Sequence, residues 1–554
     1  MKIPVEAISK TTAQMGKTNR LAPWLLLLLA AVLFFANLDN QYLWQDEAET
    51  ALLARRILNY GLPLAFDGRN MINQYPTRTE LQFNADYIWI YHPWLPHYLT
   101  ALSFFLFPPG TLSARLPVVL ASLISVLIFY QSCRHHLGGD RLATIATVLL
   151  LSIVPLVIHL RQAKYFGWTV LFTILLVDAY LRLEKKERIA LPLFILSALL
   201  LFHSNFGIFL PTVAVLGVWP FLVPSWQTIR RPVVLGLGLV AVLAGPWALF
   251  MAVGKRGAPF SIYRFLGHFV HYLAYIFGWV FPLVLVIVFV GLYFISLRRH
   301  PVGFTEEQMR LIHLFVAIVA ANVLLLSYSF DWIYFRYVVQ LVPLLVMLLA
   351  LLVDKIIGVS RPLGYVLLVL LCYTSVLHTP PFALVTAANL RMTSWQDRED
   401  FAAVDKVILK AAQWRSDQAQ YIYEITHDFD SPDEGIVKYL QTYALPTDKV
   451  LTNYGELVIA FYTDLTVGGG LSGYRAEELA VAPWIIPRQY GPYYGDLMHV
   501  VSVGPYEPIE IPYPDTLWGN GPAPEDHLYA TAKGERNVVI YHRIGAPTQQ
   551  EGER

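Results

Sequence analysis

Charged residues and cysteines are both scarce in this sequence. Asp, Glu, Lys and Arg make up 15% of the 554 residues, whereas hydrophobic residues make up 56%. Soluble domains carry about 25% charged residues, so this composition excludes an ordinary soluble protein. The two cysteines, Cys133 and Cys372, are too few for a disulfide framework or a cysteine metal site. No nucleic-acid partner is expected.

Long apolar runs, in contrast, are plentiful. A membrane helix needs about 20 mostly apolar residues, and about eleven runs approach that length. They cover residues 21–38, 114–130, 142–160, 166–183, 189–202, 208–223, 233–253, 272–297, 311–329, 337–353 and 363–377. The sequence therefore predicts a polytopic α-helical membrane protein. Residues 93–107 are also apolar but short, and we expect a helix at the membrane interface there.

Basic residues predict which side of the membrane each loop occupies. Lys and Arg concentrate in short cytoplasmic loops. With a cytoplasmic N-terminus, the inside loops are 134–141, 182–188, 230–231, 298–310 and 354–361, and all of them are basic. The first outer loop, 39–113, and everything after about residue 379 then lie outside. This arrangement suits a bacterial inner membrane.

The composition changes after residue 378, and the last part of the chain is polar. Residues 433–444 have helical spacing, 449–454 and 537–544 have strand character, 456–463 could form either, and 467–473 are expected to form a loop. A stretch of this length is sufficient for one soluble α/β or α+β domain. We therefore divide the chain into a membrane domain, 1–378, and a soluble domain, 379–554.

Two adjacent carboxylates, Asp46 and Glu47, follow the first apolar run. The residues after them alternate with helical spacing, with Glu49 and Arg56 opposite a broad apolar face, and Gly61 ends the pattern. We expect an amphipathic helix that lies on the membrane surface. Asp46 could be only a helix cap, because a carboxylate is favourable in a first turn, or it could be a functional group.

Several short motifs follow these carboxylates in a fixed order. They are DEA at 46–48, ILNYGLP at 57–63, YHPWLPHYL at 91–99, SARLP at 113–117, LRQAKYF at 160–166, LLLFHSNFG at 199–207 and FRYVVQLVPLLVMLLA at 335–350. In this order they resemble the GT-C membrane glycosyltransferases, and most of all the branch of protein O-mannosyltransferases and lipid A aminoarabinose transferases. The resemblance covers roughly the first 350 residues.

The resemblance implies transfer of a monosaccharide from a polyprenyl-phosphate donor to an acceptor hydroxyl on the outer face of the membrane. The acceptor could be a protein, a lipid or a polysaccharide. A carboxylate can take the acceptor's proton, and cations can stabilise the departing phosphate. The implied catalytic residues are Asp46, as general base, and Glu47. The implied donor phosphate-binding residues are Arg161, Lys164, Arg264 and Arg336, and the implied substrate-binding residues are Tyr91, His92, His97, Tyr165, His203 and Tyr337.

No cofactor and no metal site are expected. His92, His97 and His203 lack the tight spacing of a committed metal site. Metal-dependent oligosaccharyltransferases carry an acidic pair in the second outer loop, where this chain has Arg161 and Lys164. The acidic run that begins at Asp46 is the one place where binding of a hard divalent cation is not excluded.

Two other functions stay open on the sequence alone. One is a polymerase or ligase of surface polysaccharide, which shares the carrier lipid but transfers a larger glycan. The other is a non-enzymatic transporter of lipid-linked glycans. Charges that cluster at one surface and the lack of visible repeats argue against the transporter.

Overall fold

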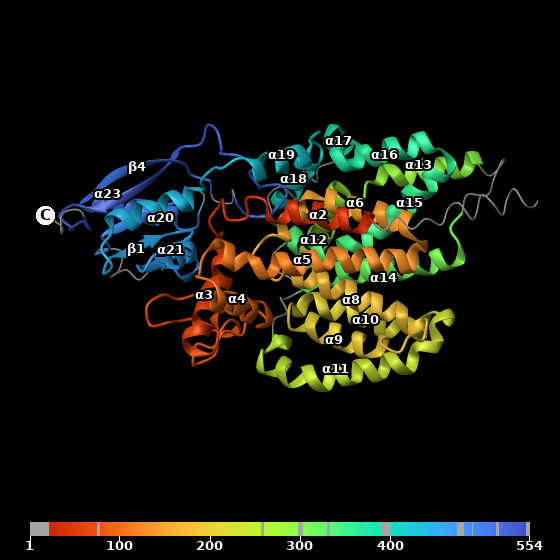
Figure 1. The fold of residues 1–554 in the computed structure, drawn as a ribbon. Helices are drawn as coiled ribbons and strands as arrows, with labels where there is room; N and C mark the ends of the chain where they lie inside the picture. The colour runs from red at the N-terminus through yellow and green to blue at the C-terminus, as the bar shows by residue number, and fades with distance from the viewer. Residues whose placement is uncertain are drawn as a thin grey trace, which may run out of the picture.

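The molecule consists of a helical bundle with a small sheet domain at one end, and the first outer loop lies between them (Figure 1). The computed structural model describes residues 21–74, 78–255, 260–296, 303–329, 333–388, 399–473, 481–489, 491–516 and 520–549. The basic segment before residue 21 and part of the predicted basic loop 298–310 lie outside the described residues.

Thirteen helices form the bundle as it is described. They are α2 (Ala22–Phe35), α5 (Thr111–Cys133), α6 (Asp140–Ser152), α7 (Val154–His159), α8 (Phe166–Glu184), α9 (Ala190–Phe202), α10 (Phe206–Leu222), α11 (Arg230–Phe250), α12 (Ile262–Tyr275), α13 (Leu283–Ser296), α14 (Glu306–Ser329), α15 (Val342–Val359) and α16 (Arg361–Tyr373). Among the described residues, five helical segments are long and apolar enough to span a membrane, and α12 with α13 forms a sixth, bent candidate. The chain is therefore an integral membrane protein. The predicted number of eleven spans is not confirmed, because several of the apolar helices have only 10–17 residues.

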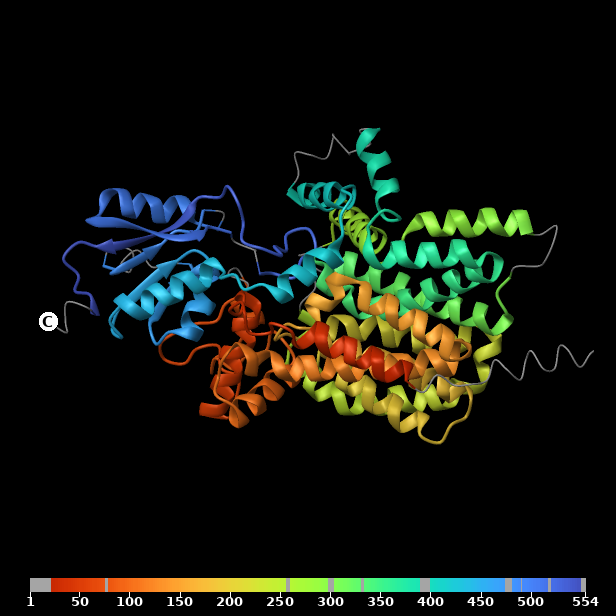
Figure 2. The same ribbon diagram turned by 45° about the horizontal axis from the view of Figure 1, so that its top comes forward.

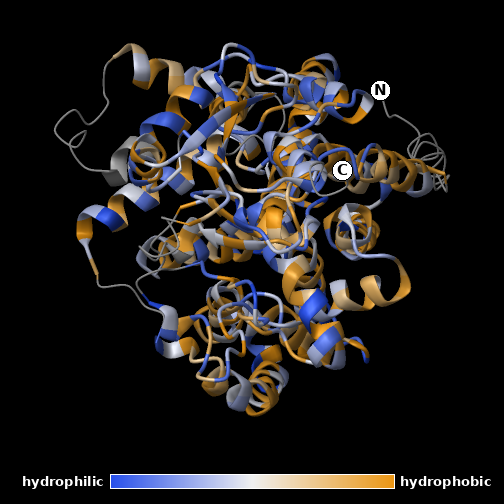
Figure 3. Ribbon diagram, turned by 90° about the vertical axis from the view of Figure 1, so that its left-hand side faces the viewer, coloured by the Kyte–Doolittle hydropathy of each residue, from blue (hydrophilic) through white to orange (hydrophobic). Residues whose placement is uncertain are grey.

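Apolar side chains cover the outside of the bundle, as expected for a surface in contact with lipid. Figure 3, viewed from the sheet-domain end, shows hydrophobic residues along the bundle helices. On α11, Leu235, Val242 and Leu249 are 68%, 70% and 83% exposed. Such large exposed side chains over a whole helix face are not expected in a soluble protein.

Three predicted spans are interrupted at or near prolines. The run 142–160 breaks between α6 and α7, where Pro155 begins the new helix. The run 272–297 bends by 70° between α12 and α13, next to Pro282. The run 337–353 begins with 3-10 turns, η6 (Phe335–Tyr337) and η7 (Val339–Leu341), before Pro343 in α15. Proline lacks the amide proton that a continuous helix needs, so these are natural break points.

The first outer loop contains the two predicted helices, α3 (Gln45–Tyr60) and α4 (Leu95–Leu106). Gly61 ends α3 with a φ of +77°, a left-handed conformation that glycine adopts without strain. The charged face of α3 is less exposed than predicted: Glu49 is 0% and Arg56 2% exposed. The reason is that Glu49 contacts Lys164 and His92, and Arg56 bonds to residues 64–70 of the same loop. The apolar face of α3 packs against α4 and the sheet domain's α21.

The polar C-terminal part begins with helices that lie against the bundle (Figure 2). These are α17 (Thr379–Ala387), α18 (Glu399–Ala411) and α19 (Asp417–Thr426). Helix α18 packs on α12, and α19 contacts α16. The division of the chain at residue 379 stays a prediction.

The sheet domain has the predicted mixture of helices and strands. It contains α20 (Pro432–Tyr443), α21 (Glu456–Tyr462), α23 (Tyr494–Val503), β1 (Lys449–Thr452), β2 (Thr466–Gly469), β3 (Trp484–Ile486), β4 (Tyr506–Pro514) and β5 (Asn537–Arg543). The sheet order is β2-β1-β3-β5-β4, with parallel pairing around β1 and antiparallel pairing of β5 with β3 and β4. The predicted loop at 467–473 is partly wrong, because its first residues form β2 and pair with β1.

Candidate functional site

The first turn of α3 carries the predicted catalytic carboxylates, at the end of the bundle that faces the sheet domain (Figure 1). Asp46 accepts a hydrogen bond from Nη1 of Arg336, which lies in η6 just before α15. The side chains of Asp46 and Arg336 keep 15% and 17% exposure. The structure thus joins two predicted site residues that are 290 positions apart in the sequence.

The guanidinium of Arg336 is enclosed by aromatic rings. Its Cζ lies 4.1 Å from the ring centroid of Tyr334, 5.4 Å from that of Tyr337 and 6.0 Å from that of Trp44. Its Nε is buried and has no hydrogen-bond partner among the described residues. Arg336 therefore holds Asp46 through one nitrogen and keeps a second donor for another group.

Glu47 is in a closed environment, in contrast to Asp46. Arg115 donates from Nε to Oε1 over 2.9 Å and from Nη2 to Oε2 over 2.7 Å. The backbone amides of Ala163 and Trp44 donate to the same carboxylate over 2.7 and 3.3 Å. Glu47 is 0% exposed. These contacts favour a structural role for Glu47, which also caps the start of α3.

A third carboxylate, Glu49, lies beside Asp46 on α3, because residues three apart lie on the same side of a helix. Lys164 donates to its Oε1 over 2.9 Å, and Nδ1 of His92 lies 2.9 Å from the same oxygen. Lys164 also donates to the backbone oxygen of Asp46 over 3.2 Å. Burial alone would raise the pKa of Glu49, but Lys164 and His92 outweigh it and hold that pKa well below the usual range.

Aromatic rings extend from this cluster. The ring of Tyr91 lies 4.6 Å and that of Tyr165 6.2 Å from the ring of His92, between centroids. His97 in α4 is 1% exposed, and neither of its ring nitrogens has a partner in the described part of the chain. The structure thus gathers Tyr91, His92, Lys164 and Tyr165 near Asp46.

Three other predicted site residues lie against different parts of the protein. Arg161 donates to the backbone oxygen of Ala36 over 2.6 Å and to the hydroxyl of Tyr421 over 3.0 Å. His203 follows α9, and its ring lies 5.7 Å from that of Trp247. Arg264 lies in the first turn of α12. A role of these residues beside Asp46 stays a prediction.

Arg115 and Glu49 were not predicted as site residues. Arg115 lies within α5, and a charge inside an apolar helix requires a partner, which was a signal for the pair with Glu47. Glu49 could have been found from its spacing of three residues from Asp46.

The arrangement offers little to a divalent cation. No group of three His, Cys, Asp or Glu side chains suited to a metal occurs among the residues that the structure describes. Asp46, Glu47 and Glu49 each contact a positively charged side chain instead. A metal at this run therefore gains no support from the geometry.

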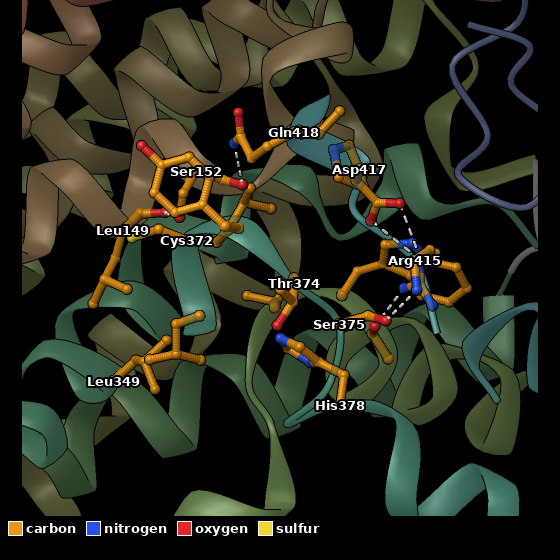
Figure 4. A pocket seen from close by; sticks show the side chains of 18 residues that line it. Leu149, Ser152, Leu349, Cys372, Thr374, Ser375, His378, Arg415, Asp417 and Gln418 are labelled. Atoms are coloured by element: carbon orange, nitrogen blue, oxygen red, sulfur yellow. Dashed lines mark hydrogen bonds and ion pairs between the residues drawn. The ribbon is translucent and has the colours of Figure 1, made fainter. Parts of the chain in front are cut away.

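A separate polar cavity lies where α6 and α16 end (Figure 4). Arg415 enters it from the segment before α19. The guanidinium donates to the backbone oxygen of Gly278 over 2.9 Å and to Asp417 over 3.2 Å, and it stacks 4.5 Å from the ring centroid of Trp279. The backbone amide of Arg415 donates to the hydroxyl of Ser375 over 2.9 Å. These contacts tie the C-terminal segment to the bundle, so the cavity has a structural explanation.

Neither protein-family models nor curated protein sequences give a match to this chain. Solved structures do. Apo ArnT from Cupriavidus metallidurans is 15% identical and aligns over 93% of this chain and 97% of its own, with a TM-score of 0.51. This chain has the fold of ArnT. ArnT is a lipid A aminoarabinose transferase, so the predicted resemblance to the GT-C glycosyltransferases is confirmed at the level of the fold.

Two further solved structures align over most of this chain. ArnT bound to undecaprenyl phosphate is 14% identical over 94% of this chain and 98% of its own, with a TM-score of 0.49. The oligosaccharyltransferase AglB from Archaeoglobus fulgidus, in complex with an inhibitory peptide and a dolichol-phosphate, is 12% identical over 88% of this chain and 73% of its own, with a TM-score of 0.41.

Proposed function

We propose that this protein is a glycosyltransferase that moves a monosaccharide from a polyprenyl-phosphate donor to an acceptor hydroxyl. The observation that carries the proposal is the Asp46–Arg336 pair, in which a carboxylate meets a cation with a buried donor still unpartnered. The ArnT fold supports it, because ArnT binds undecaprenyl phosphate, a lipid of the proposed donor class.

Arg336 and Lys164 are the proposed ligands of the donor phosphate. Arginine presents several N–H groups in one plane, which matches the oxygens of a phosphate. The unpartnered Nε of Arg336 supplies such a donor, and Lys164 adds a second positive charge at the same turn of α3. Both charges stabilise the phosphate as it leaves the sugar.

Asp46 is the proposed general base. The acceptor hydroxyl gives its proton to the Asp46 carboxylate while its oxygen bonds to the anomeric carbon. The bond from that carbon to the phosphate oxygen breaks, and the phosphate keeps the electron pair. Because Arg336 contacts both groups in this scheme, movement of the guanidinium toward the phosphate frees Asp46 for the proton.

Tyr91, His92, Tyr165 and Tyr337 are the proposed sugar-binding side chains. Their rings surround the Asp46–Arg336 pair and the adjacent Glu49. Aromatic faces with polar tips are suited to a sugar ring, which has both apolar and hydroxyl surfaces.

We further propose that the bundle lies in a bacterial inner membrane with the sheet domain outside. The basic loops at the opposite end of the bundle support this orientation. Packing of α21 on α3 supports a role of the sheet domain in covering the site.

The test compares wild-type protein with Asp46→Asn, using a panel of radiolabelled polyprenyl-phosphate monosaccharides and membrane extract as the acceptor. We expect wild type to consume one donor and Asp46→Asn to be about 100-fold slower or more, as for loss of a general base. Asp86→Asn is the matched control, since Asp86 is an exposed carboxylate of the same outer loop.

Two results would contradict the proposal in different ways. If Asp46→Asn matches wild type, Asp46 is not the base. If wild type consumes no monosaccharide donor, the transferase function fails, and the glycan transporter becomes the better hypothesis. Thermal unfolding of all three proteins checks that the substitutions leave the fold intact.

A further inference from the structure

A second polar cavity lies between the bundle and the C-terminal segments. Its walls come from the residues after α2, the turn between α7 and α8, the end of α19 and the segment before β5. Arg161 and Gln41 line it, and Asp46 and Arg336 do not. Gln162 lines the same cavity and accepts a hydrogen bond from the Trp44 indole over 3.1 Å. Arg115 also lines it and pairs with Glu47, so the cavity adjoins the start of α3.

Two residues that line this cavity have a buried donor without a partner among the described residues. Arg161 is 9% exposed and uses Nη1 and Nη2 on Tyr421 and Ala36, but its Nε bonds to nothing in the described part of the chain. Gln41 is 8% exposed, and its Nε2 is likewise without a partner there. Native proteins satisfy nearly all buried donors, so these two need acceptor atoms from water or from a ligand.

Of the two arginines that line the cavity, one makes no ion pair among the described residues. Arg115 is neutralised by Glu47. His527 pairs with Glu424 over 3.0 Å. Burial alone would lower the pKa of His527, but the Glu424 carboxylate outweighs it and that pKa lies above its ordinary value. Arg161 has no carboxylate within ion-pair distance among the residues described.

We propose that this cavity binds an oxyanion, a phosphate or a carboxylate group, through Nε of Arg161 and Nε2 of Gln41. An oxyanion supplies acceptor atoms to both donors and balances the Arg161 charge. Its source is either a lipid headgroup or an acidic group of the acceptor. The sequence resemblance implied that Arg161 binds the donor phosphate. This proposal assigns Arg161 to a second anion instead.

Phosphate binding to the full-length protein tests the assignment. The probe is inorganic phosphate, titrated into protein in a phosphate-free maltoside detergent, and the readout is the shift in the thermal unfolding midpoint. We expect Gln41→Leu and Arg161→Gln each to weaken binding by about 10-fold or more, since each removes one donor. Gln41→Leu keeps the side-chain bulk, so it separates loss of binding from loss of fold.

Arg336→Gln distinguishes this cavity from the proposed donor site. If phosphate binding survives Arg336→Gln but falls in Gln41→Leu, the cavity is the anion site whether or not the transferase proposal holds. If binding is lost only in Arg336→Gln, or Gln41→Leu binds as wild type does, the proposal is wrong.

A second arm identifies the source of the oxyanion. Wild type and Gln41→Leu are placed in nanodiscs of phosphatidylglycerol and of a phosphate-free glycolipid. Stabilisation by phosphatidylglycerol that Gln41→Leu loses, without an effect of free phosphate, assigns a lipid headgroup. If neither free phosphate nor phosphatidylglycerol stabilises wild type relative to Gln41→Leu, the cavity does not bind an oxyanion.

Discussion

Asp46 and Glu47 are neighbours in one helical turn, yet they differ in exposure and in the number of hydrogen bonds that they accept. Glu47 is fully buried, and its oxygens accept four hydrogen bonds from Arg115 and two backbone amides. Asp46 is partly exposed and contacts Arg336, whose Nε is still unpartnered. A rotation of about 100° between successive helical residues turns one carboxylate into the protein and the other toward an open site. Two adjacent carboxylates can therefore be suited to different roles, one in holding the fold and one in a reaction.

The sheet domain contains a second closed ion cluster that clarifies this difference. Arg488 is 0% exposed and donates to Asp433 over 2.5 Å and to Asp515 over 2.6 Å. Its third nitrogen donates to the backbone oxygen of Thr516 over 3.2 Å. Arg115 and Arg488 thus have their donors occupied, whereas Arg336 does not. A buried Nε without a partner separates Arg336 from Arg115 and Arg488, although among the described residues Arg310, which pairs with Glu184, shares this feature.

Loss of Arg115 should produce the largest change in stability. Arg115→Ala leaves the Glu47 carboxylate buried without a counterion, which typically costs about 3–5 kcal/mol. We expect a large fall in the thermal unfolding midpoint and poor expression. Asp46→Asn, at the open pair, should unfold near the wild-type temperature. If Arg115→Ala unfolds as wild type does but loses sugar transfer, Glu47 belongs to the reaction and the contrast with Asp46 fails.

Glu456, the first residue of α21, lies against the start of α3, and it has no cation in contact among the described residues. Gln45 donates to its Oε1 over 2.7 Å, and its Oε2 is buried without a partner in the same part of the chain. Burial raises the pKa of Glu456 from 4.5 to about 7. The folded protein therefore binds a proton here that the unfolded chain has already released between these two pH values.

This difference predicts how stability depends on pH. Because the folded state holds the extra proton, the contribution of Glu456 to stability falls as the pH rises from 4.5 through about 7. The total loss is about 3 kcal/mol for a shift of this size. Glu456→Gln stays neutral, so its unfolding midpoint should rise relative to wild type between pH 5 and 8, about the window of that shift. Glu510→Gln, at an exposed carboxylate of β4, is the control; a constant difference for Glu456→Gln would contradict the prediction.

Arg336→Gln should slow sugar transfer by about 100-fold, because one charged hydrogen-bond donor to the leaving phosphate is lost. The fold should survive, since the partly exposed Asp46 can reach water. Arg336→Lys keeps the charge but not the planar set of donors, so it should recover only part of the rate. Turnover of the donor identified with wild type measures this series. Equal rates for Arg336→Gln and wild type would remove Arg336 from the reaction.

The sequence predicts the fold of this chain better than the roles of its residues. Apolar runs, the helix that ends at Gly61 and the order of the motifs all depend on neighbouring residues, and the structure confirms a helical membrane protein with the ArnT fold. Strand β2 was missed because its glycines are poor strand formers, and pairing with β1 overrides that preference.

The different environments of Asp46 and Glu47 could not be predicted in the same way. Their partners, Arg336 and Arg115, are 290 and 68 positions away. Sequence spacing carries no information about which arginine meets which carboxylate. The burial of Glu49 likewise depends on Lys164, which lies 115 positions away.

The smallest expected effect concerns the end of α3 and tests how firmly the helix positions both carboxylates. Gly61 has a φ of +77° and nothing within 4 Å of an added Cβ, so Gly61→Ala introduces backbone strain without a clash. The cost of that conformation for alanine is about 1 kcal/mol. Gly245→Ala, inside α11 and also without a close neighbour, is the control and should be neutral or stabilising. If the strain instead shifts α3, Gly61→Ala should slow sugar transfer far more than it lowers the unfolding midpoint, because transfer depends on the position of Asp46 relative to the acceptor and Arg336.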